Sequence, residues 1–455
     1  MCSSFVKPSD TNQMRAWKNY LPVIISTIAL SIVAIWNAFP LLYADTSTFL
    51  VSGFELETPF DRPISYGILL RIFSLNGMFI WLVVILQSFL VSWLSLRLFH
   101  SAKDHDKWQW FGVLALICAA LFSTLSWYTS LLTPDIFSAI AALALINLLV
   151  GKSQKKITIT LYLIFFVSVT THLGHVSYFI AFIALLALLK LIKGVNALKA
   201  IRWQKIAVLF SLTCLSILTM GSAMAKSKNG FFLAAMLENG VLVPYLDEAC
   251  ETQDYEICKY KDELPQKAWE FLWLESSPFY KMGDWKGSRE EFGEIISETL
   301  TNPRYIALHI QCSLKASLKQ AVTFGVADGT GAFGEKTELN QRIHAYLPNS
   351  VSGFKYSRQY KDQLKGMEWL NRFLMLTTIC FALISLAWFL RWKQLNETIQ
   401  LTLLLMLIAL LLNVWVSGTF GNAIPRLGGK MIWFLPIIAF LGLKNRIQKS
   451  DQIKS

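Results

Sequence analysis

The feature of this sequence that most constrains its fold is a succession of long apolar runs separated by short polar connections. The chain has 455 residues, of which 54% are hydrophobic and 16% charged, and its mean hydropathy is +0.45. Soluble globular proteins carry about 25% charged residues, and apolar runs of about 18 residues or more are typical of transmembrane helices. The pattern therefore predicts an all-α polytopic membrane protein.

We expect about ten transmembrane helices, in two blocks on either side of one polar region. Residues 1–19 precede helices 1 to 7 within 20–223, the polar region covers 224–368, helices 8 to 10 lie within 369–443, and 444–455 form a tail. The first run, 20–43, has no small-residue cleavage site after it, so we interpret it as a retained helix. The expected helices cover residues 20–43, 78–99, 108–127, 135–150, 157–170, 176–191, 206–223, 369–389, 399–416 and 431–443.

Lys and Arg are concentrated in the connections on the side that holds both chain ends. An even number of helices puts the two ends on one side, and every connection there carries at least two basic residues. The short connections of the opposite side hold only Arg62, Arg71, Arg426 and Lys430. Because short loops rich in Lys and Arg stay in the cytoplasm, we expect cytoplasmic termini and an extracytoplasmic 224–368. The same distribution accounts for the net charge of +12 without a nucleic-acid partner.

Several ionisable residues fall at the outer ends of the expected helices. An ionisable group costs about 2.5–3.5 kcal/mol at the membrane centre on insertion scales and less near the interface, so such groups are rare unless they line a cavity. Their shared depth, from four different connections, predicts a polar cavity that opens outward; the alternative is that interface loops simply carry charge. The residues are Asp45, Asp61, Arg62, Asp135, His172, His175, Arg426 and Lys430.

The long first outer loop, 44–77, holds three of these residues. Asp45 follows helix 1 directly, and its carboxylate could serve as a general base, a metal ligand or an N-cap, of which capping is the common use before Thr and Ser. Asp61 and Arg62 could form a simple surface ion pair at a turn, since Pro63 disfavours a helical conformation at Arg62. The alternative is that Arg62, with its planar fork of donors, clamps a phosphate.

The other outer-face residues allow similar alternatives. Asp135 opens helix 4, where the helix dipole favours an acid in any case. His172 and His175 are three residues apart on one helical face; they could bind a metal, although histidines that hydrogen-bond to backbone are the commoner case. Arg426 and Lys430 are four residues apart, and at a helix start they could hold an anionic head group.

The polar region, 224–368, is expected to be mainly helical. Cys250 and Cys258 lie close together in CETQDYEIC, which predicts a disulfide if this region is on the oxidising side of the membrane. The glycine-rich GVADGTGAFG at 325–334 is not followed by Gly-Lys-Ser/Thr and is preceded by no strand, so we interpret it as a flexible loop or lid and not as a phosphate-binding P-loop.

One amphipathic helix is predicted within the polar region, from Pro303 to about Val322. Its apolar residues recur every four positions, the spacing of one helical face: Ile306, Ile310, Leu314 and Leu318.

The arrangement resembles the GT-C superfamily of membrane glycosyltransferases, multi-helix enzymes with a long first outer loop that carries an acidic residue soon after helix 1. The segments that carry the resemblance are YADTSTF with Asp45, PFDRPISYG with Asp61 and Arg62, LLTPDIF with Asp135, and NAIPRLGGKMIWFLP with Arg426. The first outer loop lacks the Asp-Glu pair that some of these enzymes have. The segments CETQDYEICKYKDELP and FLWLESSP look like a group of bacterial inner-membrane proteins, which implies that location.

The resemblance implies transfer of a sugar from a polyprenyl-phosphate donor to an envelope acceptor on the outer face of the membrane. Asp45 would activate the acceptor hydroxyl, or would ligate, with Asp135, a divalent Mg or Mn ion that does so. Arg62, Arg426 and Lys430 would stabilise the leaving polyprenyl phosphate. The remaining substrate-binding positions would be Asp61, His172 and His175. Two other functions stay open: a transporter or flippase for a lipid-linked or anionic substrate, and a non-enzymatic component of envelope assembly.

Overall fold

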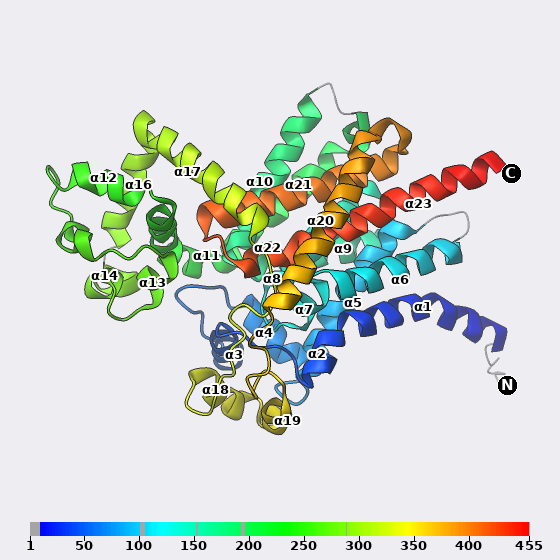
Figure 1. Cartoon of the computed structure of the whole chain (residues 1–455), viewed down its shortest axis with the longest axis horizontal. Helices are drawn as coiled ribbons and strands as arrows, with labels where there is room; N and C mark the ends of the chain where they lie inside the picture. Colours follow the sequence, from blue (N-terminus) through cyan, green and yellow to red (C-terminus); the bar gives the residue numbers. More distant parts are fainter. Residues whose placement is uncertain (1–9, 101–104, 152, 193–195, 288, 455) are drawn as a thin grey trace, which may run out of the picture.

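The chain folds almost entirely into helices. The computed structural model describes residues 10–100, 105–151, 153–192, 196–287 and 289–454; it is 78% helical and forms no strand in these ranges. Both described ends of the chain lie on one side of the helical body, and helices α12 to α16 project from the opposite side (Figure 1). The all-α prediction is confirmed.

The body consists of helices from both ends of the chain. Six segments are long and apolar enough to cross a membrane, which suggests a membrane protein, whereas the predicted number of about ten is not confirmed; the six are Trp81–Phe99, Leu173–Leu191, Trp203–Met220, Glu368–Leu390, Glu397–Phe420 and Pro425–Gln452. The helices of the body are α1 (Asp10–Leu30), α2 (Ile32–Asn37), α5 (Trp81–Phe99), α6 (His105–Phe122), α7 (Leu125–Ser130), α8 (Asp135–Val150), α9 (Lys155–Thr170), α10 (Leu173–Leu191), α11 (Trp203–Asn239), α20 (Glu368–Leu390), α21 (Glu397–Phe420), α22 (Pro425–Ile432) and α23 (Phe434–Lys454), with 3-10 turns at Asn196–Ala200 and Trp392–Gln394.

The first apolar run is not one helix to residue 43, as the sequence suggested. It divides at Ser31 into α1 and α2, and α2 ends at Asn37, because Ala38 adopts a left-handed conformation with φ 63°. Pro40 follows and has no N–H to continue a helix. The side-chain amide of Asn37 donates to the carbonyl of Phe39 at 2.7 Å, which holds the turn. The chain then runs extended towards Asp45.

The helix predicted to end at Ala223 continues to Asn239. No helix-breaking proline occurs between residues 223 and 240, and α11 stops only where Gly240, with φ 84°, forms a left-handed C-cap. The expected boundary at 224 therefore falls inside a single helix, which leads from the body directly into the insert.

The insert contains two parts with different packing. Residues up to Tyr305 bury a core of their own, which includes Tyr245, Phe271, Phe279 and Phe292. In this part Cys250 and Cys258 form a disulfide with Cα atoms 5.7 Å apart. The later residues, such as Val326, Leu339 and Phe354, belong instead to the core of the main body. The helices of the insert are α12 (Leu242–Ala249), α13 (Ala268–Trp273), α14 (Pro278–Lys281), α15 (Asp284–Gly287), α16 (Arg289–Thr301), α17 (Pro303–Val322), α18 (Glu338–Tyr346) and α19 (Val351–Tyr356), with 3-10 turns at Glu256–Glu263 and Pro348–Ser350.

Residues 44–77, the predicted first outer loop, form a compact pair of helices, α3 (Thr46–Glu55) and α4 (Ser65–Phe73). They cross at Gly53 and Gly67, where a Cβ on Gly53 would lie 2.1 Å from the carbonyl oxygen of Gly67. Beside this crossing, the rings of Phe49 and Tyr66 meet edge to face at 4.9 Å. The crossing fixes the loop that carries Arg62 relative to the start of α3.

We predict that Gly53→Ala destabilises the protein by about 1–3 kcal/mol, the usual cost of overpacking, because the added methyl group forces α3 and α4 apart. Gly331→Ala is the control, since a Cβ at Gly331 meets nothing within 4 Å. Thermal unfolding in detergent should show a lower midpoint for Gly53→Ala only. Equal midpoints for the two variants would contradict the close crossing.

Candidate functional site

Two extended segments bring the first outer loop next to the start of α8. The N–H of Leu41 donates to the carbonyl of Ser130 at 2.9 Å, and the N–H of Leu132 donates back to the carbonyl of Leu41 at 2.9 Å, as in a short parallel bridge. Asp45 and Asp135 follow these two segments at the starts of α3 and α8. Backbone pairing therefore places two acids that are far apart in the sequence at one site.

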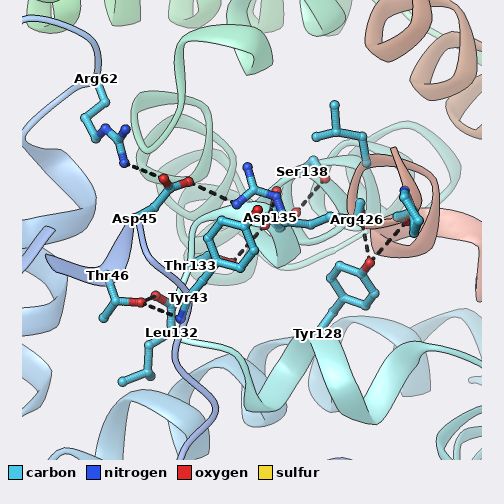
Figure 2. A network of polar contacts seen from close by, with 12 residues as sticks. Tyr43, Asp45, Thr46, Arg62, Tyr128, Leu132, Thr133, Asp135, Ser138 and Arg426 are labelled. Atoms are coloured by element: carbon cyan, nitrogen blue, oxygen red, sulfur yellow. Dashed lines mark hydrogen bonds and ion pairs between the residues drawn. The ribbon is translucent and has the colours of Figure 1, made fainter. Parts of the chain in front are cut away.

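Asp45 lies between two arginines that come from opposite ends of the chain (Figure 2). Its Oδ1 is 3.1 Å from Nη1 of Arg62, and its Oδ2 is 2.9 Å from Nη1 of Arg426. Arg62 also contacts Oδ2 of Asp61 through Nε at 2.8 Å and Nη2 at 2.5 Å. The two arginine side chains are only 13% and 15% exposed, so these charges are paired largely out of water.

Asp45 occupies the N-cap position of α3 without acting as a cap. Its side chain makes no capping hydrogen bond, and the hydroxyl of Thr46 donates to the carbonyl of Leu132 at 3.0 Å. Burial would raise the pKa of Asp45, but the charges of Arg62 and Arg426 outweigh burial and hold that pKa well below its usual range. The capping alternative is therefore wrong for this side chain, which is ionised at neutral pH.

Arg426 is the central cation of the site. Its Nε lies 3.6 Å from Oδ2 of Asp135, which also accepts a 2.9 Å hydrogen bond from the hydroxyl of Thr133. The guanidinium carbon stacks 4.2 Å from the ring centre of Tyr43. The hydroxyl of Tyr128 donates to the backbone carbonyl of Arg426 at 2.9 Å, which orients the first turn of α22 (Figure 2). One side chain thus joins both acids.

Two buried glutamines that the sequence analysis did not single out hold the extended segments in place. The side chain of Gln359 accepts from the N–H of Leu42 at 2.9 Å and donates to the carbonyl of Leu42 at 2.7 Å. Gln87 donates to the carbonyl of Leu131 at 3.1 Å and accepts from the hydroxyl of Tyr66 at 3.1 Å. A glutamine within an apolar run is the only sequence signal for Gln87.

His172 and His175 hydrogen-bond to the backbone, the commoner of the two roles considered for them. Nδ1 of His172 accepts from the N–H of Gly174 at 3.0 Å and caps α10, and Nδ1 of His175 lies 3.0 Å from the carbonyl oxygen of Ser168. Burial, together with the nearby charges of Lys430 and Arg426, lowers the pKa of His172 to about 3. His172 is therefore neutral at physiological pH and supplies no positive charge to a phosphate.

Lys430 lies one helical turn after Arg426 on α22, and only 7% of its surface is exposed. Within the described parts of the chain, no hydrogen bond or ion pair reaches its ammonium group. A largely buried cation is stabilised by pairing with an incoming anion.

The carboxylates of the site do not fit a divalent metal as they are arranged. Arg426 contacts both Asp45 and Asp135, so a guanidinium occupies the position that a shared cation would take. Among the described residues, no group of three or more His, Cys, Asp or Glu side chains could hold a metal ion.

One small cavity adjoins the site, and a larger groove lies among the helices of the body. A cavity of about 20 Å³, room for about one water molecule, is lined by Tyr128, Asp328, Thr330 and Arg426. A larger groove of about 770 Å³ between α1, α2 and α5 is lined almost wholly by apolar side chains and reaches Ile35. The neighbouring ring of Trp36 packs 6.1 Å from that of Trp127, which also lines the small cavity.

No protein-family model matches this sequence, and neither a curated protein nor a solved structure matches it.

We predict that Asp45→Asn lowers stability at pH 7 by up to about 3 kcal/mol, the low end for breaking a buried pair, since Asp45 is partly exposed. A depressed pKa means that the ionised carboxylate stabilises the fold above its unfolded-state pKa of about 3.9, and that this stability is lost as the pH falls further. The difference in unfolding midpoint between wild type and Asp45→Asn should therefore persist from pH 7 to about pH 4 and narrow below it.

The control is Glu248→Gln, which removes an exposed ion pair with Arg304 that is worth at most about 1 kcal/mol. A midpoint difference for Asp45→Asn that is absent at pH 7, or that stays unchanged in acid, would contradict the paired carboxylate.

Proposed function

We propose that this protein is a GT-C-like membrane glycosyltransferase that moves a sugar from a polyprenyl-phosphate donor to an acceptor on the outer face of a bacterial inner membrane. The observation that carries the proposal is the pair of arginines held by Asp45. Arg62 and Arg426 present two guanidinium groups to one point, and such forks match phosphate oxygens. The unpartnered ammonium of Lys430 lies one turn further along α22.

The groove between α1, α2 and α5 supports a lipid-linked donor. Its walls are almost wholly apolar from Tyr20 to Ile35, and the ring of Trp36, the residue after Ile35, packs against Trp127, which lines the small cavity beside Arg426. The isoprenoid chain of such a donor would find in this groove surroundings about as apolar as lipid tails. A lipid-linked donor could place its phosphate at Arg426 and its lipid tail in the apolar groove.

The donor phosphate and Asp45 would share the arginines. When phosphate oxygens take donors of Arg62 and Arg426, the charges that depress the pKa of Asp45 are partly compensated, and its pKa rises towards the range of a general base. The acceptor hydroxyl then gives its proton to the Asp45 carboxylate while its oxygen bonds to the sugar's anomeric carbon. The bond from that carbon to the phosphate oxygen breaks, and the electron pair leaves on the polyprenyl phosphate, which the arginines stabilise.

Substrate binding requires the glycine-rich loop to move. The cavity of about 20 Å³ beside Arg426 is too small for a sugar phosphate, and Asp328 and Thr330 of this loop form one of its walls. Gly329, with φ 69°, packs against the ring of Tyr43, where a Cβ would lie 2.0 Å from the nearest ring atom. The described conformation is therefore the closed one, and the loop acts as a lid.

Transport of a lipid-linked or anionic substrate is the second candidate. It is favoured by two interrupted helices, α1–α2 at Ser31 and α22–α23 at Trp433, since transporters place half-helix ends at their substrates. The two functions differ in their products, because transport leaves the sugar on its carrier and transfer creates a new glycosidic bond.

We predict that Asp45→Asn lowers transfer by about 10²–10⁴-fold, the usual contribution of a positioned acid or base. Mass spectrometry of envelope glycans and lipids should show a sugar modification in cells that carry the wild-type gene and not in deletion cells. Glu57→Gln, an exposed acid in the same loop, is the matched control and should restore the modification.

Amounts of folded protein are compared by size-exclusion chromatography, so that a stability loss is not mistaken for a catalytic one. Full modification by folded Asp45→Asn would refute the catalytic role of Asp45. The absence of any gene-dependent sugar modification, with altered sidedness of a lipid-linked sugar, would favour transport.

A further inference from the structure

Helix α17 presents an apolar row to its outside instead of burying it. The sequence predicts this helix from its spacing, and the structure places it at Pro303–Val322. An amphipathic helix of a soluble domain turns its apolar stripe towards the core. Here every member of the row is exposed, by at least a third of its surface: Ile306 36%, Ile310 58%, Leu314 62%, Leu318 73% and Val322 64%.

The opposite face of α17 packs as helices pack inside membranes. Ala316 lies so close to α21 that a Cβ on Gly418 would be 2.9 Å from the backbone of Ala316. The hydroxyls of Ser313 and Thr419 form a 2.6 Å hydrogen bond across the two helices. Close approach through small residues with hydroxyl cross-links is characteristic of helix pairs in lipid, and α21 is itself one of the six candidate spans.

The apolar row continues onto α21. The indole of Trp415 donates to the hydroxyl of Ser313 at 3.1 Å and is 37% exposed, and Leu411, one turn earlier on α21, is 59% exposed. The other end of α17 reaches α22, where Gln320 donates to the carbonyl of Ile424 at 3.2 Å. The helix therefore runs along the outer part of a candidate membrane span towards the site.

A second exposed row on α17 is polar and basic. Gln311, Lys315 and Lys319 lie next to the apolar row at the same four-residue spacing and are exposed. An apolar row beside a basic row is the pattern of a helix at a membrane surface, where ammonium groups reach lipid phosphates while the apolar side chains enter the acyl region.

We propose that α17 is embedded in the outer leaflet of the membrane, with the row from Ile306 to Val322 in contact with acyl chains. The occupant of this face is the bilayer, since the row is continuous with the exposed apolar side chains of α21 and is flanked by lysines that suit anionic head groups. The insert would then be divided: its first part, with the core around Phe271 and Phe279, projects into water, and α17 returns the chain to the membrane. This proposal does not depend on glycosyl transfer.

The test uses the full chain in nanodiscs of phosphatidylethanolamine and phosphatidylglycerol, with the free cysteines replaced by alanine. A nitroxide label is attached to Leu314→Cys or Leu318→Cys, and its collisions with oxygen and with a water-soluble nickel chelate are measured by power-saturation electron paramagnetic resonance. Leu383→Cys on α20, 62% exposed in the native chain, is the lipid reference, and Glu290→Cys on α16 is the water reference.

The expected result is that labels at Leu314 and Leu318 behave as at Leu383. Nickel collisions should fall on the order of tenfold relative to Glu290, a partition difference of about 1.4 kcal/mol, while oxygen collisions rise. Nickel accessibility equal to that at Glu290 would place the row in water and overturn the proposal. Low accessibility to both reagents with an immobile label would show that protein covers the row and would also overturn it.

Discussion

The double ion pair of Asp45 is the interaction on which the rest of the site depends. One carboxylate joins Arg62, from the first outer loop, to Arg426, near the end of the chain. Charges buried in this way are costly unless each is paired. The two ion pairs of Asp45 therefore hold three elements together: the start of α3, the loop before α4, and α22. Removal of the carboxylate would leave two largely buried guanidinium groups facing each other. An anion that replaces or joins Asp45 there meets a site already built for negative charge.

The fold provides this arrangement through backbone that is not helical. The first apolar run ends early at Asn37, and the extended segment after it pairs with the residues that precede α8. Backbone polar groups that are buried away from water must find partners in the protein, and the side chains of Gln87 and Gln359 supply those hydrogen bonds. The irregular segments are therefore held rigidly, which is the condition for placing charged groups with precision.

Hydrophobic periodicity and charge were sufficient to predict the helical class and the amphipathic helix at Pro303–Val322, and to single out charged residues that the structure brings together. The residues of the site were visible because charge is rare beside apolar runs. Their pairing was not predictable, because Asp45 meets Arg426 through long-range packing that no local pattern encodes. The roles of His172 and His175 also depended on structure, since the same spacing suits a ligand pair and two backbone-bonded rings. The break at Asn37 was missed, although Pro40 was a signal for it.

The central claim is that Asp45 and Arg426 act as one coupled unit. The most direct measurement is a double-mutant cycle with Asp45→Asn, Arg426→Gln and the double variant, each unfolded in the same detergent at pH 7. The account predicts that the second substitution costs little after the first, with a coupling free energy of about 1–3 kcal/mol, as for contacting charged residues. Additive losses, with no coupling beyond about 0.5 kcal/mol, would contradict it.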